Sequence, residues 1–175
     1  MDDSKEKLAA QVFDSIGDMV RGYAQEAVRV AQKQFGVRLD FTPHSIAALE
    51  GLLEGQAAAD LDFQSRLWGS YLGEVMRFRW NGEWLLAQYP GGQAAVPTLE
   101  VSGSRLYPTM KIYRRLTLGA AESVLTFCQM VASRLDAPPA IPGPAIPAPR
   151  SSHAETLAAG KPAEREDAET GREEE

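Results

Sequence analysis

Apolar residues recur at steps of three and four between residues 5 and 35, and this period predicts one long amphipathic helix. Its apolar face consists of Leu8, Val12, Ile16, Met19, Tyr23, Ala27 and Val30. Gly17 and Gly22 lie inside the segment, and each costs about 1 kcal/mol relative to alanine in a helix interior. Tertiary packing must therefore stabilise this helix. The same steps are also typical of a coiled-coil seam, so a homodimer through this helix is an alternative. The repeat is short, however, and favours a helix that covers its own domain.

A second helix is expected after a short extended connector at residues 37–41. Thr42 and Pro43 favour a helix start, because a hydroxyl can cap the first turn and proline fits into it. This helix should extend to about Gly55, with Glu50 and Glu54 on its outer face.

A third helix, from Asp62 as N-cap to about Trp80, is apolar over roughly 220° of its circumference, far more than a surface helix needs. The apolar positions are Phe63, Leu67, Trp68, Tyr71, Leu72, Val75, Met76 and Phe78. Gly69 and Gly73 lie four residues apart on the remaining arc, where the missing side chains let another backbone approach closely. Charged residues nearby argue against a membrane helix pair of the kind this spacing can form. The pattern predicts a central helix with neighbours on most sides.

Beyond residue 81 the pattern predicts a small antiparallel sheet of about three strands. Asn81 and Gly82 mark a turn, and strands are expected at residues 83–89, 98–101 and 105–107. A tight turn at residues 102–104 should join the last two strands.

The remaining elements are helical. Residues 109–119 fit either a helix or a strand, and we favour a helix with Met110, Tyr113 and Leu116 facing inward. A closing helix is expected at residues 120–135, with an apolar face formed by Val124, Leu125, Cys128, Val131 and Leu135. The elements together predict a single α+β domain over residues 1–136.

Composition changes near residue 136. Residues 136–175 contain no aromatic side chain and seven of the 11 prolines, with 4 of the 18 Lys and Arg but 9 of the 24 Asp and Glu. They account for −5 of the formal charge of −6. Such a segment has too little apolar surface to offset the entropy lost on ordering. Residues 137–175 are therefore expected to form a disordered tail, Pro-rich at first and then acidic.

The charge and the apolar runs argue against several functions. The nearly neutral body lacks the broad basic surface that nucleic-acid binding requires. No apolar run approaches the roughly 20 residues of a membrane span, and the first residues do not resemble a secretory signal. A single cysteine fits a reducing compartment. These features favour a cytoplasmic protein that binds neither nucleic acid nor membrane.

Glu74 is the first candidate site residue, because it lies at the edge of the apolar arc of the third helix. A carboxylate there needs a positive partner, which could be Arg77 three residues later or a cation from the segment 111–115. Glu74 is then either a general base or ligand-binding acid, or one half of a buried ion pair that fixes the helix. The ion pair is the favoured interpretation.

Two further sets of residues are typical of binding surfaces. The first is aromatic, and core and interface aromatics look alike in sequence; its members are Trp68, Tyr71, Trp80, Trp84 and Tyr89. Among them Trp80 is the one expected to contact something outside the core. The second set is the basic cluster Lys111, Arg114 and Arg115, which could bind a phosphate or an acidic peptide. Its alternative is a solvated face, or pairing with Glu74, Glu83 and Glu100.

Catalytic groups are scarce. The two histidines, His44 and His153, do not form a pair that could hold a metal. Cys128 lies on an apolar helix face without a visible histidine partner, which favours a buried structural thiol. We expect no cofactor and no metal. An enzyme is not the favoured interpretation, although carboxylates could still pair across the fold, which spacing in the sequence cannot show.

Three short blocks resemble a family of small bacterial domains of unknown function. The first block has the form G-x-Y-L-G-E-V-x-R, at Gly69 to Arg77. The second is Gly-x-Trp at Gly82 and Trp84, and the third is R-L-x-x-G from Arg115 to Gly119. The resemblance brings no activity or ligand, but it implies that the blocks meet in space and that Glu74 contacts the segment 111–115.

The favoured function is a non-catalytic interaction module or adaptor that binds another protein, with the tail as a flexible tether. One alternative is an immunity protein that neutralises a toxin, with an acidic face if the toxin is a basic nuclease. Another is a small-ligand or enzymatic domain that uses Glu74 with Arg77 or Arg115.

Overall fold

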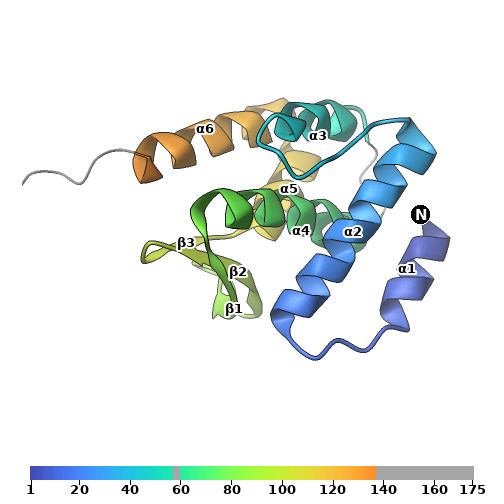
Figure 1. Ribbon diagram of the computed structural model, residues 1–175, viewed down its shortest axis with the longest axis horizontal. Helices are drawn as coiled ribbons and strands as arrows, with labels where there is room; N and C mark the ends of the chain where they lie inside the picture. Colours follow the sequence, from blue (N-terminus) through green and yellow to red (C-terminus); the bar gives the residue numbers. More distant parts are fainter. Residues whose placement is uncertain (57–59, 137–175) are drawn as a thin grey trace, which may run out of the picture. The chain divides into compact units, whose positions relative to one another are not determined.

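The computed structural model describes residues 1–56 and 60–136, and the expected disordered tail at 137–175 lies outside the described residues. The chain divides into two units, Met1–Pro138 and Pro139–Glu175, and the helices and strands of the described residues all lie in the first. Its elements, labelled in Figure 1, are α1 (Asp2–Ala9), α2 (Ile16–Phe35), α3 (Ser45–Leu53), α4 (Leu61–Trp80), β1 (Glu83–Gln88), β2 (Ala95–Val101), β3 (Ser104–Leu106), α5 (Pro108–Leu118), a 3-10 turn (Gly119–Glu122) and α6 (Val124–Leu135). The expected α+β class is confirmed.

The prediction of one long first helix is wrong, because two helices, α1 and α2, occupy that segment and lie side by side (Figure 1). The hydroxyl of Ser15 accepts a hydrogen bond from the backbone N–H of Asp18 at 3.1 Å and so starts α2 afresh. Val12, expected on the apolar face, is 90% exposed in the connection between the helices. The buried Glu26 of α2 accepts hydrogen bonds from Lys7 and Arg29, which ties α1 to α2.

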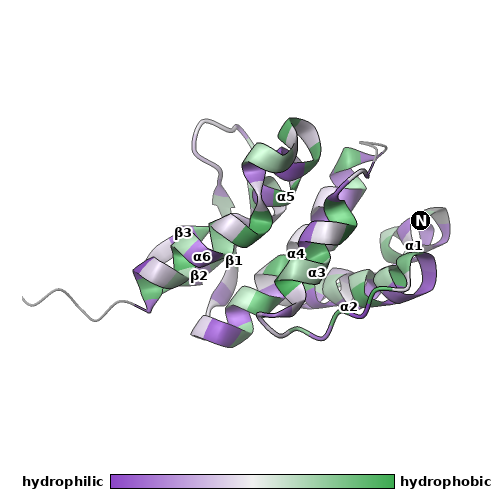
Figure 2. Ribbon diagram, turned by 90° about the horizontal axis from the view of Figure 1, so that it is seen from above, coloured by the Kyte–Doolittle hydropathy of each residue, from purple (hydrophilic) through white to green (hydrophobic). Residues whose placement is uncertain are grey.

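The apolar face of α2 packs against other elements of the same domain. This agrees with the favoured prediction that the helix covers its own domain. In Figure 2 purple and green alternate along α2, as expected for a helix with one apolar face. That face packs against α4, and its buried apolar residues are Val20, Tyr23, Ala24, Ala27, Val30 and Ala31. The face on which a homodimer was considered is thus occupied by the protein's own chain.

Helix α4 is central, as predicted: every residue from Phe63 to Val75 except Arg66 is buried, and α2 and α5 pack against it. A Cβ on Gly69 would lie 2.5 Å from the Cα of Thr109 in α5, so only glycine allows this approach. Two details differ from expectation. The residue before the helix is Asp60 rather than Asp62, and Phe78 is 60% exposed because the last turn of α4 extends beyond the core.

The sheet has the expected three antiparallel strands in the order β1-β2-β3. Trp84 pairs with Leu99 and Leu86 with Pro97 between β1 and β2, and Leu99 pairs with Leu106 in β3. The β2–β3 hairpin turns at Ser102 and Gly103, which have φ values of 49° and 75°. Positive φ at both central residues is the conformation that matches the twist of a two-residue hairpin.

The helix expected after the sheet is confirmed, but its predicted inward face is only partly right, because Leu116 packs against the core and Tyr113 does not. Ile112 and Arg115 of α5 are buried, whereas Tyr113 is 42% exposed. The reason is that Thr109 lies against Gly69, which turns the positions three and six residues later toward the core. The last helix begins at Val124 rather than at residue 120, after a 3-10 turn and a cap in which Ser123 accepts a hydrogen bond from the backbone of Thr126 at 3.2 Å.

Candidate functional site

Glu74 forms the buried ion pair that the sequence favoured. It is 2% exposed, and its Oε1 accepts hydrogen bonds from Arg77 Nε at 2.8 Å and from Trp84 Nε1 at 2.7 Å. Arg77 Nη2 donates to Oε2 at 3.0 Å. The hydrogen bonds with Glu74 raise the pKa of Arg77, since they favour the charged guanidinium. These contacts occupy the carboxylate within the fold and link α4 to β1.

The first two of the three motif blocks meet in space, and the first block also packs against the start of α5. A Cβ on Gly73 would lie 2.3 Å from the indole of Trp84 and 3.1 Å from Pro108, so the helix block contacts the strand block and the start of α5. Within the described residues, Glu74 forms its hydrogen bonds and ion pair with Arg77 and Trp84, and not with the segment 111–115 as expected. The cations of that segment pair with Glu50 and Glu122 instead.

Arg115 is a structural residue at the junction of α3, α5 and α6. It is 6% exposed, and its Nε donates to Oε1 of Glu50 at 2.7 Å. The other oxygen of Glu50 accepts the backbone N–H groups of Val124 at 2.5 Å and Leu125 at 3.2 Å, at the N-terminus of α6. Burial raises the pKa of Glu50, but the hydrogen bonds from Arg115, Val124 and Leu125 outweigh it and hold the pKa below its usual value. The prediction that Glu50 lies on the outer face is therefore wrong, because this side chain closes the end of α6.

Lys111 and Arg114 share one carboxylate. Lys111 Nζ lies 2.7 Å and Arg114 Nη2 lies 2.5 Å from the carboxylate oxygens of Glu122, and Lys111 Nζ lies 5.5 Å from the ring centroid of Phe127. The hydrogen bonds from Arg114 and then from Lys111 lower the pKa of Glu122 from 4.5 to about 2. This clamp fixes the 3-10 turn against α5.

The clamp predicts an acid-labile contact. Since the folded-state pKa of Glu122 lies below its ordinary value of 4.5, its ion pairs stabilise the fold above that pH, and this stabilisation is lost as the pH falls toward about 2. A carbon-detected NMR titration should place the Glu122 midpoint near 2. In Lys111→Met the midpoint should move back toward 4.5, and a wild-type midpoint already near 4.5 would contradict the clamp.

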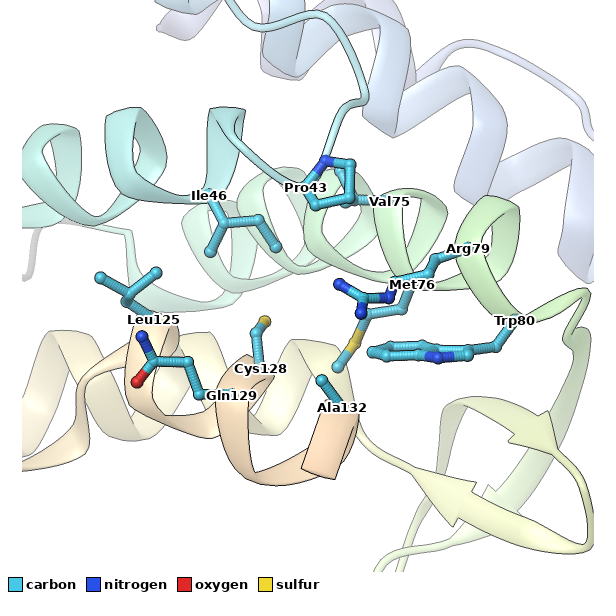
Figure 3. A pocket seen from close by; sticks show the side chains of 10 residues that line it. All are labelled: Pro43, Ile46, Val75, Met76, Arg79, Trp80, Leu125, Cys128, Gln129 and Ala132. Atoms are coloured by element: carbon cyan, nitrogen blue, oxygen red, sulfur yellow. The ribbon is translucent and has the colours of Figure 1, made fainter. Parts of the chain in front are cut away.

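Trp80 borders a small cavity between α3, α4 and α6, shown in Figure 3. Its indole Nε1 donates to Asp136 at 2.7 Å, and the Arg79 guanidinium lies 4.9 Å from the ring centroid. The cavity measures about 120 Å³ and is lined by Pro43, Ile46, Val75, Met76, Arg79, Trp80, Leu125, Cys128, Gln129 and Ala132. It is smaller than the roughly 300–1,000 Å³ of sites for drug-sized ligands. Trp80 thus contacts the residue that follows α6, and the cavity beside it is too small for most ligands.

Cys128 points into this cavity and is expected to be chemically inert in the folded protein (Figure 3). Burial raises the pKa of its thiol to about 12, so almost no thiolate is present near neutral pH. Native protein at pH 8 should react with a thiol reagent at least a hundredfold more slowly than protein unfolded in urea. Equal rates in the two states would show that the thiol is accessible.

A larger surface feature lies between α6, β3 and the adjoining part of α5. Two hollows of about 390 and 310 Å³ share Arg105, Leu106, Phe127 and Met130, so they adjoin one another, and together they are named here the α6–β3 groove. Its apolar and aromatic lining consists of Tyr89, Leu106, Tyr107, Met110, Phe127, Met130, Val131 and Leu135. Met130 is 60% exposed, although it lies on the closing helix of the core.

The charged residues of the α6–β3 groove are mostly basic. Arg105 and Arg134 line one hollow, and Arg105, Lys111 and Arg114 line the other, whereas Glu122 is the acidic residue among the lining. The groove therefore has an excess of three positive charges in a chain whose net charge is −6.

The structure divides the six predicted site residues among separate places. Glu74 and Arg77 form the buried pair, Trp80 lines the small cavity, and Arg115 binds Glu50, which closes the N-terminus of α6. Of the six, Lys111 and Arg114 reach the α6–β3 groove. Sequence reasoning missed Phe127 and Met130, and the available signal was a second apolar stripe beside the predicted face of the last helix.

In residues 1–56 and 60–136, no group of three or more His, Cys, Asp and Glu side chains could hold a metal ion. In the same residues no single helix is long and apolar enough to cross a membrane; Pro108–Glu122 and Val124–Leu135 pass that test only as a pair, bent by 98°.

In comparisons with known proteins, no family model, no curated protein and no solved structure matches this chain.

Proposed function

We propose that this chain is a non-catalytic protein-interaction module whose docking surface is the α6–β3 groove. The observation that carries the proposal is the exposure of Met130 above an apolar floor that includes Leu106 and Phe127. Exposed apolar surface rimmed by polar groups is typical of protein-binding sites. Methionine, aromatic residues and arginine are the types enriched in such interfaces.

The other candidate residues are paired or buried within the fold, and this supports the same function. Glu74 is held by Arg77 and Trp84, and Arg115 is held by Glu50. The thiol of Cys128 has a pKa raised to about 12. Each of these groups has a structural explanation, whereas Met130 in the α6–β3 groove remains 60% exposed.

The proposal is tested by comparing two variants in affinity capture. Met130→Glu places a charge in the groove, and Leu118→Glu makes the same change on α5 at a residue that does not line the groove; both side chains are 60% exposed. Surface substitutions of this kind usually change stability by less than about 0.5 kcal/mol. A protein captured from cells by the wild type and by Leu118→Glu should be lost with Met130→Glu. Capture that is the same for all three forms would contradict the proposed surface.

A further inference from the structure

Building on the proposed docking function, we infer that the α6–β3 groove binds an acidic amphipathic helix of a partner protein. Four cations and one carboxylate line the groove, while the body outside it carries more acidic than basic residues. A bound segment with carboxylates beside its apolar residues therefore meets attraction here and repulsion elsewhere on the protein.

The positions of the cations indicate how such a segment would bind. Arg134 lies in the last turn of α6, and Lys111 and Arg114 lie beside Glu122, just before its first turn. Twelve residues of α6 span about 18 Å at 1.5 Å per residue, so cations occupy both ends of an apolar stretch that fits three turns of a helix. Between them the lining is Leu106, Phe127, Met130 and Val131 with Arg105 on the β3 side.

The strand side of the groove favours a helix over an added strand. Strand β3 has only three residues, with the Ser102–Gly103 turn before it and Pro108 shortly after it. Proline has no backbone N–H to donate, so a partner strand would find a very short edge. A helix needs no backbone partners from the groove and uses its apolar side chains at steps of three and four.

The cations that line the groove are not fully neutralised by carboxylates of the chain, so they can attract a negatively charged partner. Arg114 and Arg105 are 47% and 57% exposed in their side chains, and Arg105 lies a loose 3.6 Å from Glu100. Lys111 and Arg114 share the single carboxylate of Glu122, so their combined charge is only half neutralised. Arg134 is exposed at the end of α6.

A membrane surface is the other occupant with this combination of apolar and anionic chemistry. The apolar residues of the groove line two adjoining hollows, whereas a surface that inserts into a bilayer must present its apolar side chains outward. The concave shape therefore favours a helix, and anionic vesicles serve as a separate arm of the test.

The test is a pair of NMR titrations of the full-length, ¹⁵N-labelled chain. One probe is a synthetic helix of about 14 residues with leucines at steps of three and four and glutamates flanking them. The matched probe has lysine in place of every glutamate. The glutamate peptide should shift the amide signals of Phe127, Met130 and Val131 and bind at least about tenfold more tightly than the lysine peptide, because several rim pairs of 0.2–1 kcal/mol change sign together. In Arg134→Glu, whose fold is checked by thermal unfolding, this preference should fall severalfold.

Every other outcome overturns the inference. Equal affinities, a preference for the lysine peptide, or no shift at these residues with either peptide would show that the groove does not select an acidic helix. Shifts caused by anionic vesicles, or by raising the protein concentration alone, would assign it to a membrane or to a second copy of the chain. The capture test with Met130→Glu does not depend on the sign of the partner's charge, so the docking surface can stand while this preference fails.

Discussion

Replacing Gly69 by alanine is expected to destabilise the protein by about 2 kcal/mol, although alanine is the better helix former by about 1 kcal/mol. The added Cβ would lie 2.5 Å from the Cα of Thr109 and 2.9 Å from its backbone nitrogen. Backbone atoms cannot rotate away, so α5 would have to move off α4 as a unit. Since α5 also holds Ile112 in the core and Arg115 on Glu50, that movement disturbs more than one contact.

Gly51 provides the matched control. It lies in the helix α3, and a Cβ placed on it meets no atom within 4 Å. Gly51→Ala should therefore stabilise the protein by about 0.5–1 kcal/mol through helix propensity alone. Urea unfolding of the two variants should give changes in the free energy of unfolding of opposite sign. Two changes of the same sign and size would contradict the close contact of α4 and α5.

The second large effect is expected at the buried ion pair. Arg77→Leu leaves the carboxylate of Glu74, which is 2% exposed, without its positive partner. Removing one member of a buried pair costs about 3–5 kcal/mol, and the 24% exposure of the Arg77 side chain places the cost near the lower end, at about 3 kcal/mol. Glu74→Gln should cost less, because the amide oxygen can still accept the hydrogen bond of Trp84.

A double variant separates two contributions to the cost of Arg77→Leu. One is the lost ion pair, and the other is the buried carboxylate of Glu74 that is left without a positive partner. If the cost of Arg77→Leu comes mainly from the uncompensated carboxylate, adding Glu74→Gln should recover about half of it. The free energy of unfolding of all three variants, measured in urea, provides the comparison. Additive losses in the double variant would mean that Glu74 and Arg77 stabilise the fold independently. Unchanged stability in Glu74→Gln combined with a lost binding activity would restore Glu74 as a site.

The α+β class and most of the elements could be predicted from the sequence, because periodicity and turn residues act locally. The wide apolar arc predicted a central α4, and the spacing of Gly69 and Gly73 predicted a close approach. The first helix was predicted too long because the apolar steps continue through the break. There a local signal, the cap at Ser15, outweighs the period.

The errors that remain come from contacts between distant segments. The inward face of α5 depends on where Thr109 meets Gly69, and periodicity within α5 could not show this. Glu50 looked exposed because its partners, Arg115 and the first residues of α6, follow it by 65 to 75 positions. The α6–β3 groove was missed for the same reason, since Leu106 and Met130 form one surface only after the chain has folded.

The measurement that tests the proposed docking function most directly is site-specific photo-cross-linking in cells that express the full chain. A photoreactive amino acid is placed at position 130 in the α6–β3 groove, or at position 118 on α5, where the native side chains are equally exposed at 60%. The groove predicts a discrete cross-linked protein from position 130 and none of the same mass from position 118. The same products from both positions, or none from position 130, would contradict the α6–β3 groove as the binding surface.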